Sequence, residues 1–233
     1  MRRHVLLETA PLPRGGALGL YQDGEDLVIR IEGGPGAPLM STRMHGSEDA
    51  LGRIPCERVR GRTSARVLVG GLGMGFTLRA ALDALAPDAR VVVAELVPGV
   101  VTWNEGPLGE HAGFPVRDAR TEVRVVDVAK VLKAEPLGFD AIMLDVDNGP
   151  DGLTQTKNDW LYSRAGLDVT HQALRPGGVL AIWSAGADDR FAEQVRKTGF
   201  DVEDVKVYAH GNRGTRHTLW IGTKRARRPR GPR

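Results

Sequence analysis

The chain has 233 residues, enough to bury one sizeable core and to carry a small additional module. Its composition, 41% hydrophobic and 26% charged, is that of an ordinary globular protein, and no apolar run approaches the ~20 residues of a membrane helix. The apolar stretch Val5–Leu7 is far shorter than the roughly 7–15 residues of a secretory signal, so we expect a cytoplasmic protein. The single cysteine, Cys56, excludes an internal disulfide and a cysteine-rich metal site.

Positive charge is concentrated at the C-terminal end. The net charge is +3, and residues 224–233 carry six basic side chains and no acid, which leaves −3 for residues 1–223. The segment 224–233 also contains two prolines and a glycine, so we expect a disordered basic tail. Such a tail can contact nucleic acid, but the rest of the sequence shows no matching basic patch. We therefore interpret the tail as a solvated terminus and expect no nucleic-acid partner.

Residues 1–60 are predicted to form a small β-rich unit. The apolar run Leu27–Ile31 is typical of a strand, and Leu39 begins another short element. Ser47 is predicted to cap a short helix, and Pro55 is expected to interrupt or restart that helix.

Strand and helix patterns alternate through residues 61–223, which we predict to be the main domain. The predicted strands lie at 66–69, 91–95, 121–127, 139–145 and 179–183, with two later strands around 202–208 and 217–222. The predicted helices lie at 76–85, 98–104, 163–174 and 188–198. Such alternation indicates an α/β fold with a mostly parallel, doubly wound sheet.

A glycine-rich turn, GGLGMG (70–75), joins the first of these strands to the first helix. Gly70, Gly71, Gly73 and Gly75 let a ligand approach the backbone at a helix start that presents free N–H groups. Glu95 ends the next strand about twenty residues further on, where a carboxylate can accept both hydroxyls of a ribose. The pattern indicates a ligand that contains adenosine, which leaves NAD, FAD and S-adenosylmethionine open.

Two further acids follow predicted strands. Asp127 comes after Val125-Val126, and Asp145 comes after a buried-type strand. Because the carboxyl ends of parallel strands form the ligand crevice of an open sheet, we expect Glu95, Asp127 and Asp145 to converge on one pocket. A dinucleotide oxidoreductase has no evident use for the two later acids.

Several segments resemble the spermidine synthase branch of the class I S-adenosylmethionine-dependent methyltransferase superfamily. The resemblance covers roughly residues 39–222. It rests on the glycine turn and on four further segments: AELVPGVV (94–101), VVDV (125–128), FDAIMLDVDNGP (139–150) and ALRPGGVLAI (173–182). It implies a Rossmann-like fold and a cosubstrate of the S-adenosylmethionine type.

The resemblance also implies roles for individual acids. Glu95 would bind the ribose, and Asp127 would lie beside the adenine amino group. Asp145 would accept a proton from the acceptor amine or orient that amine, because alkyl transfer to nitrogen requires a neutral amine. Asp147 would be the second acid of the aspartate-rich loop of this family. The sequence around Asp147 is equally typical of a turn.

The chain departs from the family at two places. Gly73 stands where spermidine synthases carry an acid that contacts the amine of the decarboxylated cosubstrate. The Tyr-His-Glu segment of the family has its nearest counterpart at 44–49. We assign His45 and Glu48 of that counterpart to substrate binding.

Large aromatic side chains follow the acidic loop and end the fifth strand. Trp160 and Tyr162 are predicted to line the substrate pocket, and Trp183 is a further candidate. The histidines are scattered without metal-ligand spacing, so we expect no metal.

The leading interpretation is a polyamine-biosynthesis transferase that moves an aminopropyl group from decarboxylated S-adenosylmethionine to an amine acceptor. A methyltransferase that uses S-adenosylmethionine on the same fold is the alternative, and a non-catalytic nucleoside-binding protein is a third possibility. By resemblance we also expect a homodimer.

Overall fold

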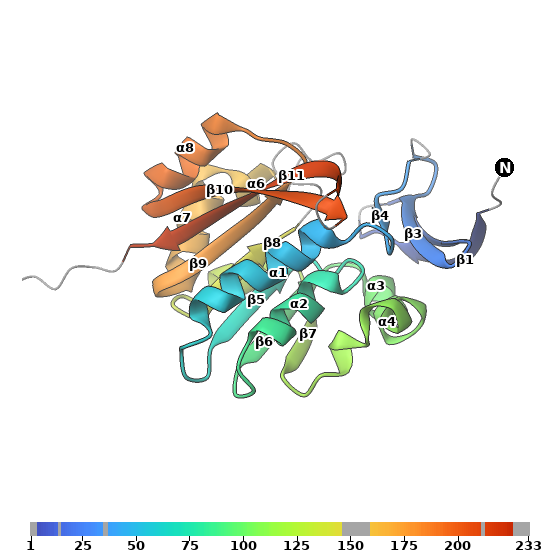
Figure 1. The fold of residues 1–233 in the computed structure, drawn as a ribbon, viewed down its shortest axis with the longest axis horizontal. Coiled ribbons are helices and arrows are strands. Elements are labelled where there is room, and N and C mark those ends of the chain that lie inside the picture. Colours follow the sequence, from blue (N-terminus) through green and yellow to red (C-terminus); the bar gives the residue numbers. More distant parts are fainter. Residues whose placement is uncertain (1–3, 14, 35–36, 146–158, 211–212, 226–233) are drawn as a thin grey trace, which may run out of the picture.

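The computed structural model describes residues 4–13, 15–34, 37–145, 159–210 and 213–225. A small antiparallel sheet stands at one end of the molecule, beside a larger sheet that carries helices on both faces (Figure 1). Within the described residues, no helix is long and apolar enough to cross a membrane.

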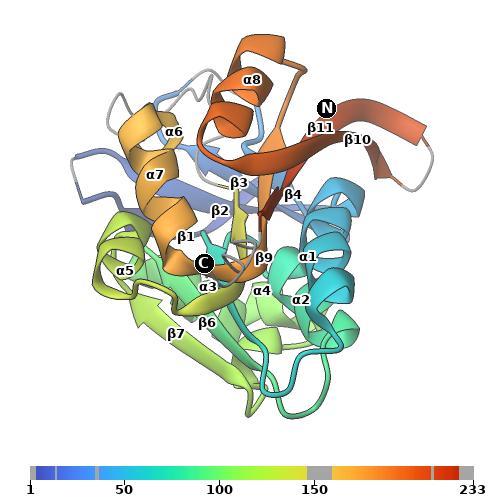
Figure 2. The same ribbon diagram turned by 90° about the vertical axis from the view of Figure 1, so that its left-hand side faces the viewer.

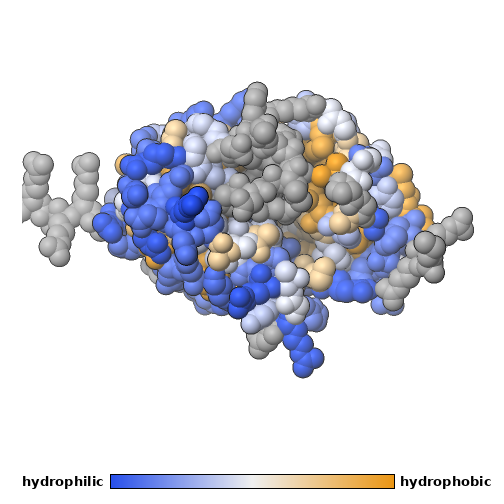
Figure 3. Space-filling view, turned by 90° about the horizontal axis from the view of Figure 1, so that it is seen from above, coloured by the Kyte–Doolittle hydropathy of each residue, from blue (hydrophilic) through white to orange (hydrophobic). Residues whose placement is uncertain are grey.

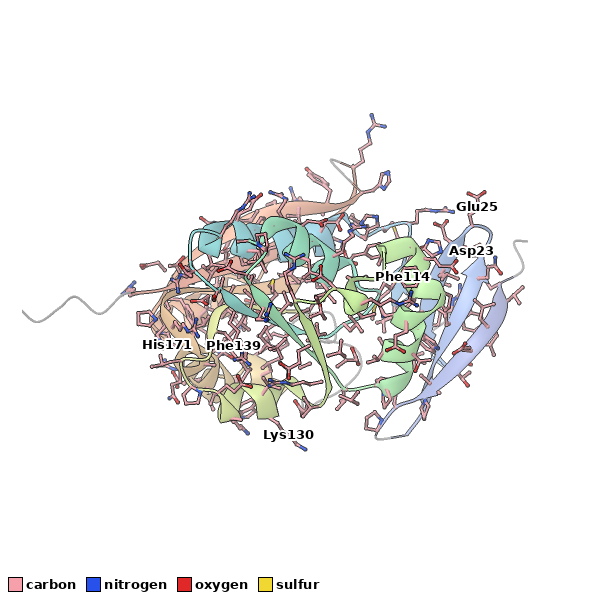
Figure 4. The ribbon with its side chains drawn as sticks, turned by 90° about the horizontal axis from the view of Figure 1, so that it is seen from below. Asp23, Glu25, Phe114, Lys130, Phe139 and His171 are labelled. Atoms are coloured by element: carbon pink, nitrogen blue, oxygen red, sulfur yellow. The ribbon has the colours of Figure 1, made fainter. Side chains whose placement is uncertain are left out.

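The small sheet has the strand order β1-β2-β3-β4. Its strands are β1 (Val5–Pro11), β2 (Ala17–Asp23), β3 (Asp26–Ile31) and β4 (Met40–Ser41). The predicted strand at 27–31 and the short element at 39–40 are confirmed as β3 and β4. Asp23 and Glu25 mark the β2–β3 turn at the far end of this sheet, away from Phe139 and His171 (Figure 4).

The helix α1 (Gly46–Val59) follows the small sheet, and two details of its prediction are wrong. Ser47 is not the N-cap, because the helix already begins at Gly46 and the Ser47 hydroxyl donates to Glu48. Pro55 lies inside the helix and does not interrupt it. Although α1 falls within residues 1–60, it packs on α2 (Phe76–Ala84) and on the large sheet.

The large sheet has the strand order β10-β11-β9-β8-β5-β6-β7. Its strands are β5 (Arg66–Gly70), β6 (Arg90–Glu95), β7 (Thr121–Val125), β8 (Phe139–Leu144), β9 (Leu174–Ser184), β10 (Phe200–His210) and β11 (Arg213–Lys224). The five strands from β9 to β7 are parallel, and β10 and β11 form an antiparallel hairpin at one edge. The predicted α/β fold with a mostly parallel sheet is confirmed.

Helices cover both faces of this sheet. Figure 2 shows α1 and α2 on one side and α5 (Val128–Ala134) and α7 (Arg164–Ala173) on the other. The remaining helices are α3 (Pro98–Glu105), α4 (Pro107–Ala112), the 3-10 helix η1 (Pro115–Arg117), α6 (Asp159–Tyr162) and α8 (Asp189–Lys197). Successive residues of β5 point to opposite faces, so Val67 and Val69 enter one core while Leu68 enters the other. These two cores hold the sheet between its helix layers.

The first two residues of the predicted disordered tail, Lys224 and Arg225, make defined contacts in the structure. Strand β11 continues to Lys224, whose Nζ donates to the carbonyl oxygens of His171 (2.7 Å) and Leu174 (2.6 Å). Arg225 pairs with Asp201. The prediction is therefore wrong for the first two residues of the segment, and residues 226–233 lie outside the described part of the chain.

A buried carboxylate joins three segments at the amino-terminal edge of the parallel strands. Asp140 of β8 is 2% exposed. Its oxygens accept hydrogen bonds from Arg62 Nη1 (2.7 Å), from the backbone N–H of Arg66 (2.8 Å) and from Arg175 Nη1 (2.7 Å). This cluster lies at the opposite ends of the strands from the acids Glu95 and Asp145, so it serves stability.

We expect Asp140→Ala to lower the free energy of unfolding by about 3 kcal/mol, because two guanidinium groups and one N–H lose a buried partner. Urea unfolding of the variant measures this change. Glu57→Ala is the control, since the exposed Arg53–Glu57 pair contributes little. Equal stability of the two variants would contradict a structural role for Asp140.

Candidate active site

A cavity of about 450 Å³ opens at the carboxyl ends of the parallel strands. Its walls come from the glycine turn, from the strand ends, and from the small sheet and the segment after it. Apolar residues gather toward the end of the molecule that carries the small sheet (Figure 3). The apolar side chains that this end gives to the wall are Leu12, Leu18, Pro38, Leu39, Met40 and Met44. The cavity thus combines a polar edge at the strand ends with an apolar wall.

The glycine turn forms the floor of the cavity. Gly71, Gly73 and Gly75 have φ angles of +91°, +51° and +86°, a region that side chains disfavour. A Cβ atom on Gly71 would come within 2.8 Å of the backbone oxygen of Asp145. Gly71 and Gly73 line the cavity, whereas Gly70 and Gly75 are not among its lining residues. The turn therefore exposes backbone to the cavity at Gly71 and Gly73, and cosubstrate binding by the four glycines stays a prediction.

Asn104 of α3 supports this turn, a role that the sequence analysis did not predict. The side chain is fully buried, and its Nδ2 donates to the carbonyl oxygens of Gly73 (2.9 Å) and Val100 (2.9 Å). A Cβ atom on Gly75 would lie 2.5 Å from Asn104 Oδ1. A polar residue on the buried face of a helix was the available signal, but only the fold shows that it faces the turn.

Glu95 ends β6, and its carboxylate is fixed at the cavity wall. Oε2 accepts from the N–H of Leu72 and Oε1 from the N–H of Val97, both at 2.8 Å. Burial raises the pKa of Glu95, and these backbone hydrogen bonds oppose that effect. Each oxygen has a second lone pair, so the carboxylate can also accept two hydroxyl donors from a ligand.

Asp127 and Asp145 reach the same cavity from the ends of β7 and β8. Strand β7 ends at Val125, two residues earlier than predicted, and Asp127 is the N-cap of α5, where Oδ1 accepts from the N–H of Ala129 at 2.8 Å. Asp145 directly follows β8, and its N–H donates to the carbonyl of Gly70 at 3.2 Å. The structure thus brings Glu95, Asp127 and Asp145 to one cavity.

The first turn of α1 contributes to the cavity wall. Glu48 lines the cavity, and its Oε2 accepts from the hydroxyl of Ser47 at 2.6 Å. His45 is not among the lining residues. Its Nδ1 lies 2.7 Å from Asp49 Oδ2, and its ring stacks on Phe76 with centroids 4.1 Å apart. His45 therefore contributes to the wall through Phe76, which does line the cavity.

The aromatic residues divide between the cavity and the core. Trp160 lines the cavity, and Lys133 Nζ lies 4.2 Å from the centre of its ring. Tyr162 is buried against Phe191 and is absent from the lining residues, while Leu161 faces the cavity. The substrate role of Tyr162 thus stays a prediction that this position does not support. Asp147 lies outside the described residues.

The hairpin side of the cavity carries a second aromatic pair. Trp183 and His217 have ring centres 4.7 Å apart and both line the cavity. Burial lowers the pKa of His217. Trp183 Nε1 and His217 Nδ1 are buried without a hydrogen-bond partner in the described part of the chain. His217 was missed in the sequence because nothing in β11 shows that this strand reaches the cavity.

No three His, Cys, Asp or Glu side chains among the described residues are grouped so that they could hold a metal ion. That the protein uses no metal stays a prediction.

Known proteins resemble this chain in sequence and in fold. It is 32% identical to polyamine aminopropyltransferase 2 of Pseudomonas aeruginosa over 120 residues, which are 50% of this chain and 32% of that protein. The chain therefore spans about a third of the length of that curated relative. No protein-family model matches the chain.

Two solved structures share the fold across 94% of this chain and 72% of theirs. One is a spermidine synthase in complex with the transition-state analogue AdoDATO, with a TM-score of 0.74 and 15% identity. The other is the spermidine synthase of Thermotoga maritima, with a TM-score of 0.73 and 13% identity. The predicted resemblance to the spermidine synthase branch is confirmed.

Proposed function

We propose that this chain, a spermidine synthase-like member of the class I methyltransferase-fold superfamily, transfers an aminopropyl group from decarboxylated S-adenosylmethionine to an amine acceptor. The observation that carries the proposal is the row of three carboxylates, Glu95, Asp127 and Asp145, along one cavity. The curated relative, a polyamine aminopropyltransferase, supports the same activity.

The strand order gives each carboxylate a place along the ligand. Neighbouring strands lie about 4.8 Å apart, and the relevant order is β9-β8-β5-β6-β7. Asp127 after β7 would face the adenine, and Glu95 after β6 would accept the ribose hydroxyls. The sulfonium and its aminopropyl chain would then lie over the glycine turn after β5. Asp145 after β8 comes next, at the place of the reacting nitrogen.

The transfer itself is a direct displacement. The neutral amine nitrogen attacks the methylene carbon next to the sulfonium, the carbon–sulfur bond breaks, and methylthioadenosine leaves with the electron pair on sulfur. Asp145 takes the proton that the nitrogen loses. The remaining contribution is positioning of the two reactants, which a shaped cavity supplies.

Titration calorimetry of the purified protein tests the choice of cosubstrate. We expect decarboxylated S-adenosylmethionine and methylthioadenosine to bind, with S-adenosylmethionine and NAD much weaker. Tighter binding of S-adenosylmethionine and S-adenosylhomocysteine would instead favour methyl transfer. Binding of NAD alone would rule out both transferases.

The acceptor is proposed to lie beyond Asp145, toward β9 and β11, where the Trp183–His217 pair lines the cavity. A homodimer and a cytoplasmic location stay predictions from the sequence. Gel filtration with light scattering of the full chain tests the dimer.

A further inference from the structure

Glu48 is a carboxylate of the cavity wall that forms no salt bridge within the described part of the chain. It lines the same cavity as the apolar side chains of Met40 and Met44. Its recorded hydrogen bond comes from the neutral hydroxyl of Ser47, and no Lys, Arg or His of the described residues forms a salt bridge with it. Burial in this environment raises the pKa of Glu48. A cationic ligand group would supply the missing charge.

The first turn of α1 lies against the first turn of α2, at the end where the glycine turn lies. His45 stacks on Phe76, and Asp49 Oδ1 lies 2.6 Å from Arg79 Nη2. The later residue of the α1 segment, Asp49, contacts the later residue of α2, Arg79, so the two helices run in the same direction. Glu48 lies between these two contacts in sequence, and α2 directly follows the glycine turn. The carboxylate of Glu48 therefore lies in the part of the cavity over β5.

The glycine turn supplies no carboxylate there. Gly73 has no side chain, and a Cβ atom on it would lie 3.2 Å from the sulfur of Met40. Met40 of β4 thus borders the place where a side chain at residue 73 would begin, and its sulfur would have to shift by a few tenths of an ångström. Glu95 is held by two backbone N–H groups, and Asp127 caps α5. Glu48 is the carboxylate left on this side of the cavity.

We propose that Glu48 holds the ammonium group of the aminopropyl chain of the donor. This inference rests on the proposed function, and it makes Glu48 the residue that selects the decarboxylated donor. S-adenosylmethionine would bring its own carboxylate close to that of Glu48, and the like charges repel each other. Decarboxylated S-adenosylmethionine brings only the ammonium.

Glu48→Gln tests the assignment with two ligands that differ in the aminopropyl group. We expect the affinity for decarboxylated S-adenosylmethionine to fall about 10- to 100-fold, as for loss of a hydrogen bond between charged groups. The affinity for methylthioadenosine, which lacks the ammonium, should stay within about twofold. Glu57→Gln, on the exposed side of α1, is the matched control and should change neither affinity.

The outcomes separate this inference from the proposed function. If wild-type protein binds neither decarboxylated S-adenosylmethionine nor methylthioadenosine, the proposed function fails. If it binds both equally, the role of Glu48 is wrong. If the wild type shows the preference and Glu48→Gln keeps it, or loses both ligands equally, the role of Glu48 is wrong. A change confined to the KM of the acceptor would also overturn it.

A relocated carboxylate gives an independent test. In the triple variant Glu48→Gln, Met40→Ala, Gly73→Asp, the shortened residue 40 leaves room for a side chain at residue 73. Aspartate tolerates the positive φ of that position better than most residues do. We expect this variant to regain the preference for decarboxylated S-adenosylmethionine over methylthioadenosine. A triple variant that binds methylthioadenosine like the wild type without regaining the preference would contradict the placement of the ammonium.

Discussion

Asp145→Asn is expected to lower the turnover of aminopropyl transfer by about 10²- to 10⁴-fold, the usual contribution of a positioned proton acceptor. The amide has the shape of the carboxylate but cannot accept the proton that the attacking nitrogen loses. Asp145 follows β8 at the cavity, beyond the expected position of the ribose, so the affinity for methylthioadenosine should change little. The rate of methylthioadenosine release and a titration of the same preparation measure both quantities.

A matched control for this substitution is Asp188→Asn. Asp188 caps α8 through the N–H groups of Arg190 and Phe191, and it is not among the residues that line the cavity. Asparagine also caps helices, so this variant should keep full activity. Turnover of Asp145→Asn near the wild-type rate would show that Asp145 does not accept the proton.

Glu95→Gln is expected to weaken every nucleoside ligand, including methylthioadenosine, by on the order of 10²- to 10⁴-fold, because two hydrogen bonds to a charged carboxylate are lost. The glutamine amide also places an NH₂ group opposite the N–H of Leu72 or of Val97, both of which donate to the Glu95 carboxylate in the wild type. Calorimetry with methylthioadenosine measures the effect. Unchanged affinity would contradict ribose binding by Glu95.

The raised pKa of Glu95 adds a prediction about pH. Since burial raises the folded-state pKa above the unfolded value, the stability linked to Glu95 is present at low pH and is lost as the pH rises through the folded-state pKa. Ligand affinity should change in the opposite direction, because the ionised carboxylate is the better acceptor for the ribose hydroxyls. Both pH dependences should weaken in Glu95→Gln.

The central sheet could be predicted because its strands are short apolar runs bounded by turn residues. Val67–Val69 and the glycine turn after it specify a strand, a turn and a helix within about fifteen residues, and the acids after the next strands follow the same rule. Convergence of Glu95, Asp127 and Asp145 then follows from parallel pairing alone. The family resemblance strengthened this interpretation but was not needed for the convergence.

Other features depend on contacts between segments far apart in the sequence. Strand β1 leaves Val5, Leu6 and Leu7 exposed, so it carries no alternation that would predict a half-buried strand. Met40 reaches Gly73 from the small sheet, and His217 reaches the cavity from β11, which is antiparallel to the strands beside it. Tyr162 and Leu161 are neighbours in a short helix, and only the packing of that helix decides which of them faces the cavity.

The products formed with decarboxylated S-adenosylmethionine test the proposed activity most directly. The purified chain is incubated with this donor and a series of linear mono- and diamines, and the products are separated by mass spectrometry, with Asp145→Asn as the inactive reference. We expect methylthioadenosine and an amine enlarged by one aminopropyl group, in equal amounts. If the wild-type chain forms neither product, aminopropyl transfer is contradicted. Formation of S-adenosylhomocysteine and a methylated amine in a parallel incubation with S-adenosylmethionine would show methyl transfer instead.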